Sequence, residues 1–304
     1  MKAISTNSLL FILLLLQHCF AQDSTHIDFL VPNTRTKRTD QISTPQFVET
    51  RVITFNLRYD NYNDGENAWD KRKVELLHCI QNENCDLYCF QEALISQVNF
   101  LKDSLGNDFA YYGIGRDDGK TGGEYSPIFY NTHRYKLMNA GTYWLSPRRD
   151  TVSRGWDAAC NRIVTVIYLY DRKVDRYLTV FNTHFDHIGV VARKHSAEII
   201  LDLLDQKPWI ESSQTILCGD FNAEESDESI QLLKERLQLA QAFDGIAKGT
   251  FNAFDTTQAP SKRIDFIFYH NFSKASIKTI EHRRRNGLWL SDHLVVEGIL
   301  LEED

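Results

Sequence analysis

The stretch ILCGDFNAEES, residues 216–226, joins an apolar run to a polar end. The run 216–218 is typical of a buried strand, and Gly219 ends it just before Asp220 and Asn222. Side chains two positions apart on a strand point to the same side of the sheet. The pattern therefore predicts that a carboxylate and an amide face the same place at the carboxyl end of this strand.

Five other apolar, β-rich runs carry reactive polar residues at one end. They are 52–55 before Asn56, 87–90 before Glu92, 178–181 before His184, 264–269 with Asp265 near its start, and 294–296 after Asp292 and His293. Each residue alone is equally well explained by a strand that ends at the surface. A solvated rim, however, would be rich in Lys, Ser and Thr, whereas these types bind hard cations and transfer protons. The set therefore predicts one functional edge.

Helices are expected between some of these strands. Residues 68–81 and 191–206 place apolar side chains at helical spacing, and Ser226 is expected to cap a third helix. In two strand–helix–strand blocks the polar ends lie 36 residues apart, from 56 to 92 and from 184 to 220. Two equivalent blocks suit two stacked sheets whose polar strand ends meet at one edge of the molecule. This predicts an α+β sandwich with helices outside.

At these residues the chain resembles the endonuclease/exonuclease/phosphatase superfamily, which includes deoxyribonucleases, abasic-site nucleases, deadenylases, sphingomyelinases and inositol phosphatases. The resemblance extends from about residue 51 to residue 301. Five motifs carry it in family order: Phe55-Asn56, Gln91-Glu92, Gly219-Asp220-Phe221-Asn222, Arg263-Ile264-Asp265 and Ser291-Asp292-His293. The fold it implies is a four-layer α/β/β/α sandwich of two mixed sheets with outer helices.

The resemblance implies a divalent-metal site. Glu92 matches the acidic Mg²⁺ ligand, and Asn56 and Asp292 match polar residues that help to hold the ion. Mg²⁺ prefers oxygen ligands and keeps several waters, so few protein carboxylates are required. Mn²⁺ is expected to substitute for it.

The resemblance also implies how a phosphoester would be attacked. Asp220 matches the carboxylate that orients or deprotonates the attacking water, and Asn222 would hold a phosphate oxygen or fix Asp220. His293 matches the histidine on the scissile phosphate, and Asp265 would set its tautomer and raise its pKa. Water would attack in line, without a covalent enzyme intermediate.

A second histidine, His184, matches another residue that faces the phosphate. Glu124, in the stretch 123–129, matches the glutamate that holds this histidine in the family. A surface glutamate beside a Gly-rich turn is the alternative interpretation of Glu124.

The substrate is predicted less sharply. The stretches around Arg116, Arg162 and Asp186 resemble a less characterised branch of the superfamily that is common in bacteria and often exported. Arg116 and Arg162 are candidates to clamp a phosphate, and Trp156 is a candidate to stack on a base or a sugar, although aromatic residues lie more often in the core. Asp186 and His187 either extend the metal site or cap the following helix.

The amino terminus is typical of an exported protein. Residues 1–21 have the charged start, apolar run and small residues of a signal peptide, with a cut after Ala21. Residues 22–46 are a predicted linker or propeptide with a possible second cut after Arg38, and 47–304 form the predicted catalytic domain. The apolar run within residues 1–21 is too short to span a membrane, and no other stretch is long enough. In an oxidising compartment Cys79 and Cys85 are the preferred disulfide pair.

Composition narrows the function. The net charge of −7 excludes nucleic-acid binding by bulk electrostatics alone. We expect a secreted, monomeric, Mg²⁺-dependent phosphodiesterase, with a nuclease as one form, whose substrate is a nucleic acid, a sugar phosphate or a lipid headgroup. The alternatives are a phosphomonoesterase or sphingomyelinase-like esterase on the same scaffold and, ranked last, a binding module without activity.

Overall fold

A computed structural model describes residues 47–205, 213–242, 245 and 248–303, all in the unit Pro45–Asp304. The predicted signal peptide and linker, with both predicted cleavage sites, lie outside the described residues. Among the described helices, none has the length and apolar character that crossing a membrane requires. The elements in chain order are β1 Phe47–Asn56, η1 Tyr62–Asn67, α1 Trp69–Asn82, β2 Leu87–Gln91, α2 Ile95–Leu105, η2 Gly106–Asp108, β3 Phe109–Tyr112, β4 Ile128–Asn131, β5 Tyr135–Trp144, β6 Ile163–Asp171, β7 Arg176–His184, α3 Val190–Asp205, β8 Gln214–Asp220, α5 Glu228–Lys234, β9 Gln238–Leu239, β10 Gln241–Ala242, β11 Asp265–His270, β12 Lys274–Ile280 and β13 Val295–Glu303.

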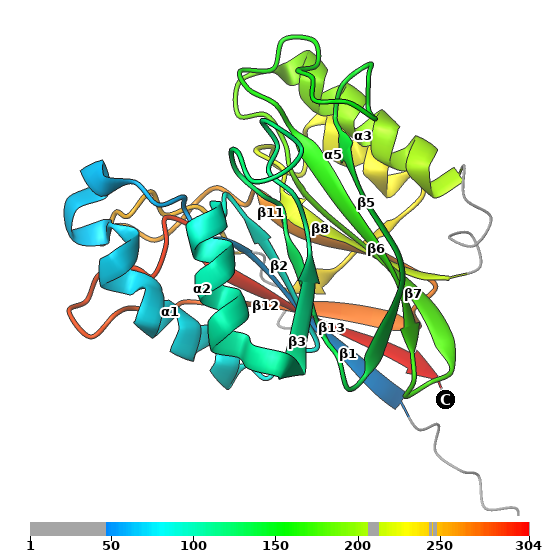
Figure 1. Ribbon diagram of the computed structural model, residues 1–304, viewed down its shortest axis with the longest axis horizontal. Coiled ribbons are helices and arrows are strands. Elements are labelled where there is room, and N and C mark those ends of the chain that lie inside the picture. Colours follow the sequence, from blue (N-terminus) through cyan, green and yellow to red (C-terminus); the bar gives the residue numbers. More distant parts are fainter. Residues whose placement is uncertain (1–46, 206–212, 243–244, 246–247, 304) are drawn as a thin grey trace, which may run out of the picture. The chain divides into compact units, whose positions relative to one another are not determined.

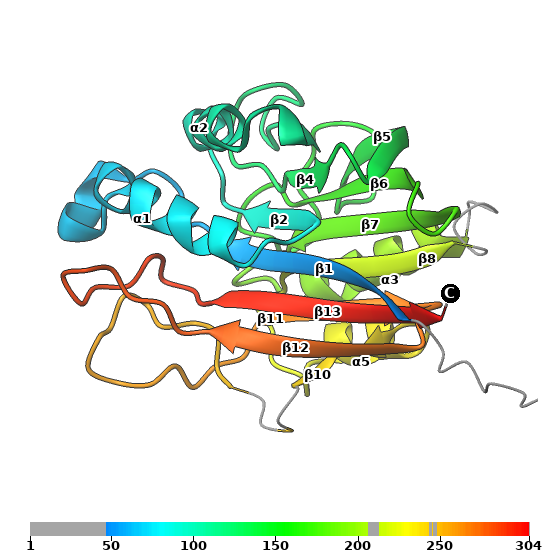
Figure 2. The same cartoon turned by 90° about the horizontal axis from the view of Figure 1, so that it is seen from below.

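The strands form two mixed sheets. One has the order β10-β12-β13-β1-β2-β4-β3, and the other has the order β5-β6-β7-β8-β11-β9. The pairs β1/β2 and β7/β8 are parallel, whereas β13 runs antiparallel to β1 and β11 runs antiparallel to β8. Figure 2 shows β1 in blue between β2 and the red β13, so the first and last described strands are neighbours.

Three apolar clusters join four layers. Side chains such as Val52 and Cys218 fill the space between the two sheets. Helices α1 and α2 pack on the outer face of the seven-stranded sheet through residues such as Leu76. Helices α3 and α5 pack on the outer face of the other sheet through residues such as Ile200 (Figure 1). Burying one such side chain contributes roughly 1.5–3 kcal/mol, and the arrangement confirms the predicted α/β/β/α sandwich.

The two predicted strand–helix–strand blocks are present and equivalent. The first block is β1, α1 and β2, and Asn56 of β1 lies opposite Gln91 of β2 in the sheet. The second block is β7, α3 and β8, and His184 of β7 lies opposite Asp220 of β8. Ile216 and Cys218 face the space between the sheets, while Leu217 faces α3 and α5. Because side chains alternate along a strand, Asp220 continues the inward row of Ile216 and Cys218. A core strand thus carries its carboxylate to the end of the seam between the two sheets.

Some local predictions were wrong. Cys79, on α1, and Cys85 are free thiols in the same apolar cluster, and the Cys85 thiol instead lies 3.7 Å from the Glu83 carbonyl oxygen. The third helix is capped by the Asp227 carboxylate, which accepts from the Ser229 amide, rather than by Ser226.

Candidate active site

Asn56 links the two sheets at the end of their seam. Its Nδ2 donates to Glu92 Oε1 at 3.0 Å and to Asp220 Oδ2 at 2.9 Å. Its Oδ1 accepts the Arg58 amide at 2.9 Å, which fixes the orientation of the side-chain amide. Asn56 is fully buried, so this one residue sets the positions of two carboxylates that come from different sheets.

Glu92 and Asp292 form the acidic side of the site. Glu92 directly follows β2 with a positive φ of 58°, and its Oε2 accepts the Tyr59 amide at 3.1 Å. Burial raises the pKa of Asp292, and the negative charge of Glu92 raises it further. Two carboxylates close enough for one to raise the pKa of the other form a donor set that a hard divalent cation would stabilise. Glu92 and Asp292 therefore fit a divalent-metal site, with Asn56 beside them.

A second group that could hold a cation contains Asp220, Asp265 and His293, whose ligand atoms lie within 4.8 Å of one another. In this group His293 Nδ1 lies 2.9 Å from Asp265 Oδ2, and Thr250 Oγ1 donates to the same oxygen at 2.6 Å. Asp265 Oδ2 already receives these two bonds, whereas the buried Oδ1 of Asp265 has no hydrogen-bond partner within the described residues.

His293 is held as a cation. The side chain is 5% exposed, and its Nε2 points toward Asp220 Oδ2 at 3.6 Å. Burial opposes the charged form, but the carboxylates of Asp265 and Asp220 raise the pKa of His293 well above its ordinary value. The aspartate that sequence analysis selected as its partner is therefore in hydrogen-bonding contact with it.

His184 is held neutral. Burial lowers the pKa of His184 well below its ordinary value, and the positive charges of Arg162 and Arg116 lower it further. Asn222 Nδ2 donates to the Phe185 carbonyl at 3.0 Å and lies 2.9 Å from His184 Nε2. Since this nitrogen is the donor, His184 Nε2 accepts, and the ring proton is on Nδ1. Asn222 adopts a positive φ of 47°, which aims its amide back at the histidine.

Asp220 lies between the two histidines. Its Oδ2 is 3.4 Å from His184 Nε2, and its Oδ1 accepts the Asn222 amide at 2.9 Å. Burial raises the pKa of Asp220 to about 7, against the opposing effect of the His293 charge. Gly219 allows the close approach of β7, because a Cβ there would lie 2.1 Å from the Thr183 carbonyl oxygen. A carboxylate that exchanges a proton near neutral pH is suited to general base chemistry.

Glu124 lies near His184 but does not bond to it. Its Oε2 is 3.8 Å from His184 Nδ1, and within the described residues that nitrogen has no hydrogen-bond partner. Both carboxylate oxygens instead accept from the Arg116 guanidinium, at 2.7 and 2.8 Å. Arg116 is thus positioned by Glu124 next to the histidine rather than extended toward solvent.

Three of the remaining predicted substrate residues, Arg162, Asp186 and His187, are joined to one another by hydrogen bonds. Arg162 Nε donates to Asp186 Oδ2 at 3.2 Å, and its NH2 group lies 3.0 Å from His187 Nδ1. Asp186 Oδ1 accepts the amides of Ile188 and Gly189, so it fixes the turn that leads into α3. Trp156 stands apart, stacked on a histidine of α3 and outside the Asp220 cluster.

Sequence analysis missed two supporting residues. Thr250 bonds Asp265, and its own carbonyl accepts the Leu294 amide at 2.7 Å, so it braces the His293 loop. Arg72, on α1, is fully buried and donates to the carbonyls of Leu57 and Leu290, next to the metal-side residues. The Thr250 segment has no periodic pattern, and a helical arginine is ordinarily expected at the surface.

The fold and these residues define a hydrolase of phosphoric esters, and the chain belongs to the endonuclease/exonuclease/phosphatase family, whose model matches residues 53–293. Members of this family generally use divalent metals, and Asp220, Asp265 and His293 are one group of described residues whose ligand atoms lie close enough together to hold an ion.

Solved structures support the family assignment. An endonuclease/exonuclease/phosphatase from Bacteroides vulgatus is 31% identical with a TM-score of 0.76, covering 84% of this chain and 100% of that chain. A mannosyl-6-phosphatase of Bacteroides thetaiotaomicron is 30% identical with a TM-score of 0.73, covering 83% and 99%. An uncharacterised protein of Acanthamoeba polyphaga mimivirus is 28% identical over 208 residues, which span 66% of this chain and 72% of the viral protein.

Proposed function

We propose that this protein is a divalent-metal-dependent phosphoric ester hydrolase that removes phosphate from a phosphorylated carbohydrate. The observation that supports the reaction class is the convergence of Asp220, His184 and His293 beside the Glu92 and Asp292 donor set. The observation that favours a sugar phosphate is the 30% identity with a mannosyl-6-phosphatase over nearly its whole length. The phosphodiesterase expected from the sequence alone is the second candidate.

Phosphoryl transfer requires mainly positioning and charge stabilisation from a protein. Asp220, fixed by Asn56 and Asn222, accepts a proton from the attacking water. His293, kept positive by Asp265, stabilises the negative charge that develops on the phosphoryl oxygens. A Mg²⁺ or Mn²⁺ ion, when bound, supplies Lewis-acid charge stabilisation. Glu92 and Asp292, with Asn56, would hold that ion.

The net charge of −7 argues against a long polyanion and in favour of a small phosphorylated substrate.

Hydrolysis assays would test the proposal directly. The protein would be incubated with mannose 6-phosphate and with an aryl phosphodiester, with Mg²⁺, with Mn²⁺ and with a chelator, beside His293→Ala. We expect metal-dependent release of phosphate from the monoester that His293→Ala abolishes. Cleavage of the diester alone would favour the second candidate. Inactivity on both substrates, together with no metal binding, would reject the proposal that the protein is an enzyme.

We also propose that the protein is exported, on the basis of the signal-peptide pattern in residues 1–21. Expression in a secretory host followed by amino-terminal sequencing of the medium would test this. A mature start at Gln22 or Thr39 is expected, and retention of the full chain inside the cell would contradict it.

A further inference from the structure

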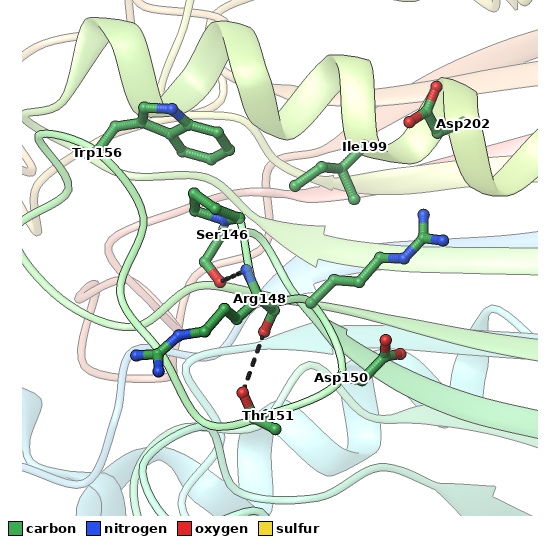
Figure 3. Close-up of a pocket in the computed structure, with 9 residues that line it drawn as sticks. Ser146, Arg148, Asp150, Thr151, Trp156, Ile199 and Asp202 are labelled. Carbon is green, nitrogen blue, oxygen red and sulfur yellow. Dashed lines mark hydrogen bonds between the residues drawn. The ribbon is translucent and has the colours of Figure 1, made fainter.

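A surface pocket of about 570 Å³ lies beside α3 (Figure 3). Its walls are the loop 146–151, Trp156, and the α3 residues Ile199 and Asp202. None of these residues belongs to the Asp220 cluster, so the reaction described above leaves the pocket without a role.

The loop wall is built before any ligand arrives. Ser146 Oγ lies 2.6 Å from Ser153 Oγ, and it also accepts the Arg148 amide at 3.1 Å. Ser153 Oγ in turn approaches the Arg148 carbonyl oxygen at 2.9 Å. Gly155 packs so closely that a Cβ there would lie 2.6 Å from the Leu145 carbonyl oxygen. These contacts give a pre-formed pocket, as small-molecule sites usually are.

Trp156 is an exposed aromatic residue held in an uncommon backbone conformation. It is 39% exposed and has a φ of 45°. Its ring stacks on His195 with a centroid distance of 4.2 Å, and the neighbouring Asp157 accepts the Ala192 amide at 2.7 Å. A bulky residue at positive φ is strained and persists only where its surroundings hold it, often at ligand sites. The stacking and the Asp157 bond therefore fix an indole at the pocket wall.

The polar groups of the pocket have mixed charge. Arg148, Asp150 and Asp202 are all exposed, and none of them forms an ion pair with another described residue. Figure 3 shows Trp156 and Asp202 along one side of the pocket and Arg148 and Asp150 on the other. Guanidinium donors and carboxylate acceptors around one aromatic ring match a ligand that has hydroxyl groups and an apolar face.

We propose that this pocket is a second carbohydrate subsite, which binds sugar units of the substrate away from the phosphorylated one. The proposal rests on the proposed function and extends it from a single sugar phosphate to a phosphorylated oligosaccharide. The segment 153–162 connects the two places, because Trp156 lines the pocket and Arg162 pairs with Asp186, two residues beyond His184. A nucleic acid is a poorer occupant, since Asp150 and Asp202 balance Arg148 and Arg149 and leave the lining without net positive charge.

Binding of an unphosphorylated sugar chain tests the subsite without any catalysis. Mannotetraose would be titrated into the full chain by calorimetry, alongside Trp156→Ala, Trp156→Phe and Tyr62→Ala, the last being an exposed aromatic residue outside the pocket. We expect Trp156→Ala to weaken binding about tenfold or more, Trp156→Phe to retain part of it, and Tyr62→Ala to bind as the wild type.

A kinetic measurement tests the connection with the reaction. The ratio of kcat/KM for 6-phosphorylated mannotetraose to that for mannose 6-phosphate is expected to exceed one and to fall to about one in Trp156→Ala. Hydrolysis of both phosphates without mannotetraose binding would overturn the subsite and leave the proposed function intact. Mannotetraose binding without hydrolysis of any phosphoester would support the subsite and overturn the proposed function. Binding of a DNA oligonucleotide that requires Trp156, with no binding of mannotetraose, would replace the sugar with a nucleic acid.

Discussion

His293 and His184 face the same carboxylate, yet they are in opposite charge states. Their Nε2 atoms lie 3.6 and 3.4 Å from Asp220 Oδ2, and both side chains are buried. Behind His293 is the carboxylate of Asp265, whereas behind His184 are the guanidinium groups of Arg116 and Arg162. Burial disfavours the charged form of both rings; the carboxylates of Asp265 and Asp220 overcome this effect at His293, whereas Arg162 and Arg116 add to it at His184, so the pKa values of two residues of one type move in opposite directions.

The largest effect should come from removing the cation. We expect His293→Ala to lower kcat/KM by roughly 10³-fold, because the positive charge that stabilises the phosphoryl oxygens is lost. We expect His184→Ala to lower kcat/KM by roughly tenfold. Phosphate release with saturating Mg²⁺ measures both, and matched circular dichroism spectra check the fold. Equal losses of kcat/KM in the two variants would contradict the different roles assigned to the two histidines.

Asp265→Asn tests why the two histidines differ, because it neutralises the carboxylate that contacts His293 Nδ1. The raised pKa of His293 depends on that carboxylate, so neutralising it should move the pKa downward and reduce activity roughly 10²-fold. NMR titration of the imidazole in chelator follows the pKa in the metal-free protein. An unchanged His293 pKa would mean that Asp220 alone maintains the charge.

The turn behind His184 should contribute to stability in a pH-dependent way. Although burial opposes its ionisation, the amides of Gly189, Ala159 and Ile188 lower the pKa of Asp186. This contribution is fully present above the ordinary aspartate pKa and is lost as pH falls toward the lowered value. Asp186→Asn should therefore reduce the free energy of unfolding by about 2 kcal/mol at pH 7, and by less below pH of about 4.

Urea denaturation at several pH values measures this difference. Asp202→Asn, an exposed aspartate on the following helix, is the matched control and should change the free energy of unfolding little at any pH. A constant difference between the wild type and Asp186→Asn across the pH range would contradict the assignment.

The smallest effect is expected from Glu124. Its oxygens bond to Arg116 and lie 3.8 Å from the histidine, so Glu124→Gln should lower kcat/KM by only a few fold. The same phosphate-release assay measures it. A loss as large as that of His184→Ala would instead establish Glu124 as the direct partner that family resemblance implies.

The residues at the strand ends could be predicted from the sequence because the direction of a side chain along a strand depends only on its position relative to its neighbours. Alternation along a strand predicted that Asp220 and Asn222 face the same place, and both lie next to His184, although β8 ends at Asp220; the equal spacing of the two blocks indicated two sheets. The motif residues Asn56, Asp265 and His293 then fell on the same edge, where the structure places them.

The supporting residues could not be predicted, because their roles depend on distant partners. Val74, one of the apolar residues at helical spacing in the predicted helix 68–81, is 53% exposed, while Arg72 is fully buried. An arginine is buried here because four backbone carbonyls accept its protons, and these come from Leu57, Arg58, Asn67 and Leu290. Helical periodicity cannot detect a partner more than 200 residues away.

The pairing of β1 with β13 has a consequence for synthesis on the ribosome. Asn56 is made early, but Asp292, His293 and the strand that pairs with β1 are among the last described residues to emerge. A nascent chain has two of the three metal-side residues, Asn56 and Glu92, and lacks Asp292 and His293 until residues 291–303 have left the exit tunnel. On the proposed function, a translation product that stops before residue 291 would therefore lack the cationic histidine and be inactive toward phosphoesters.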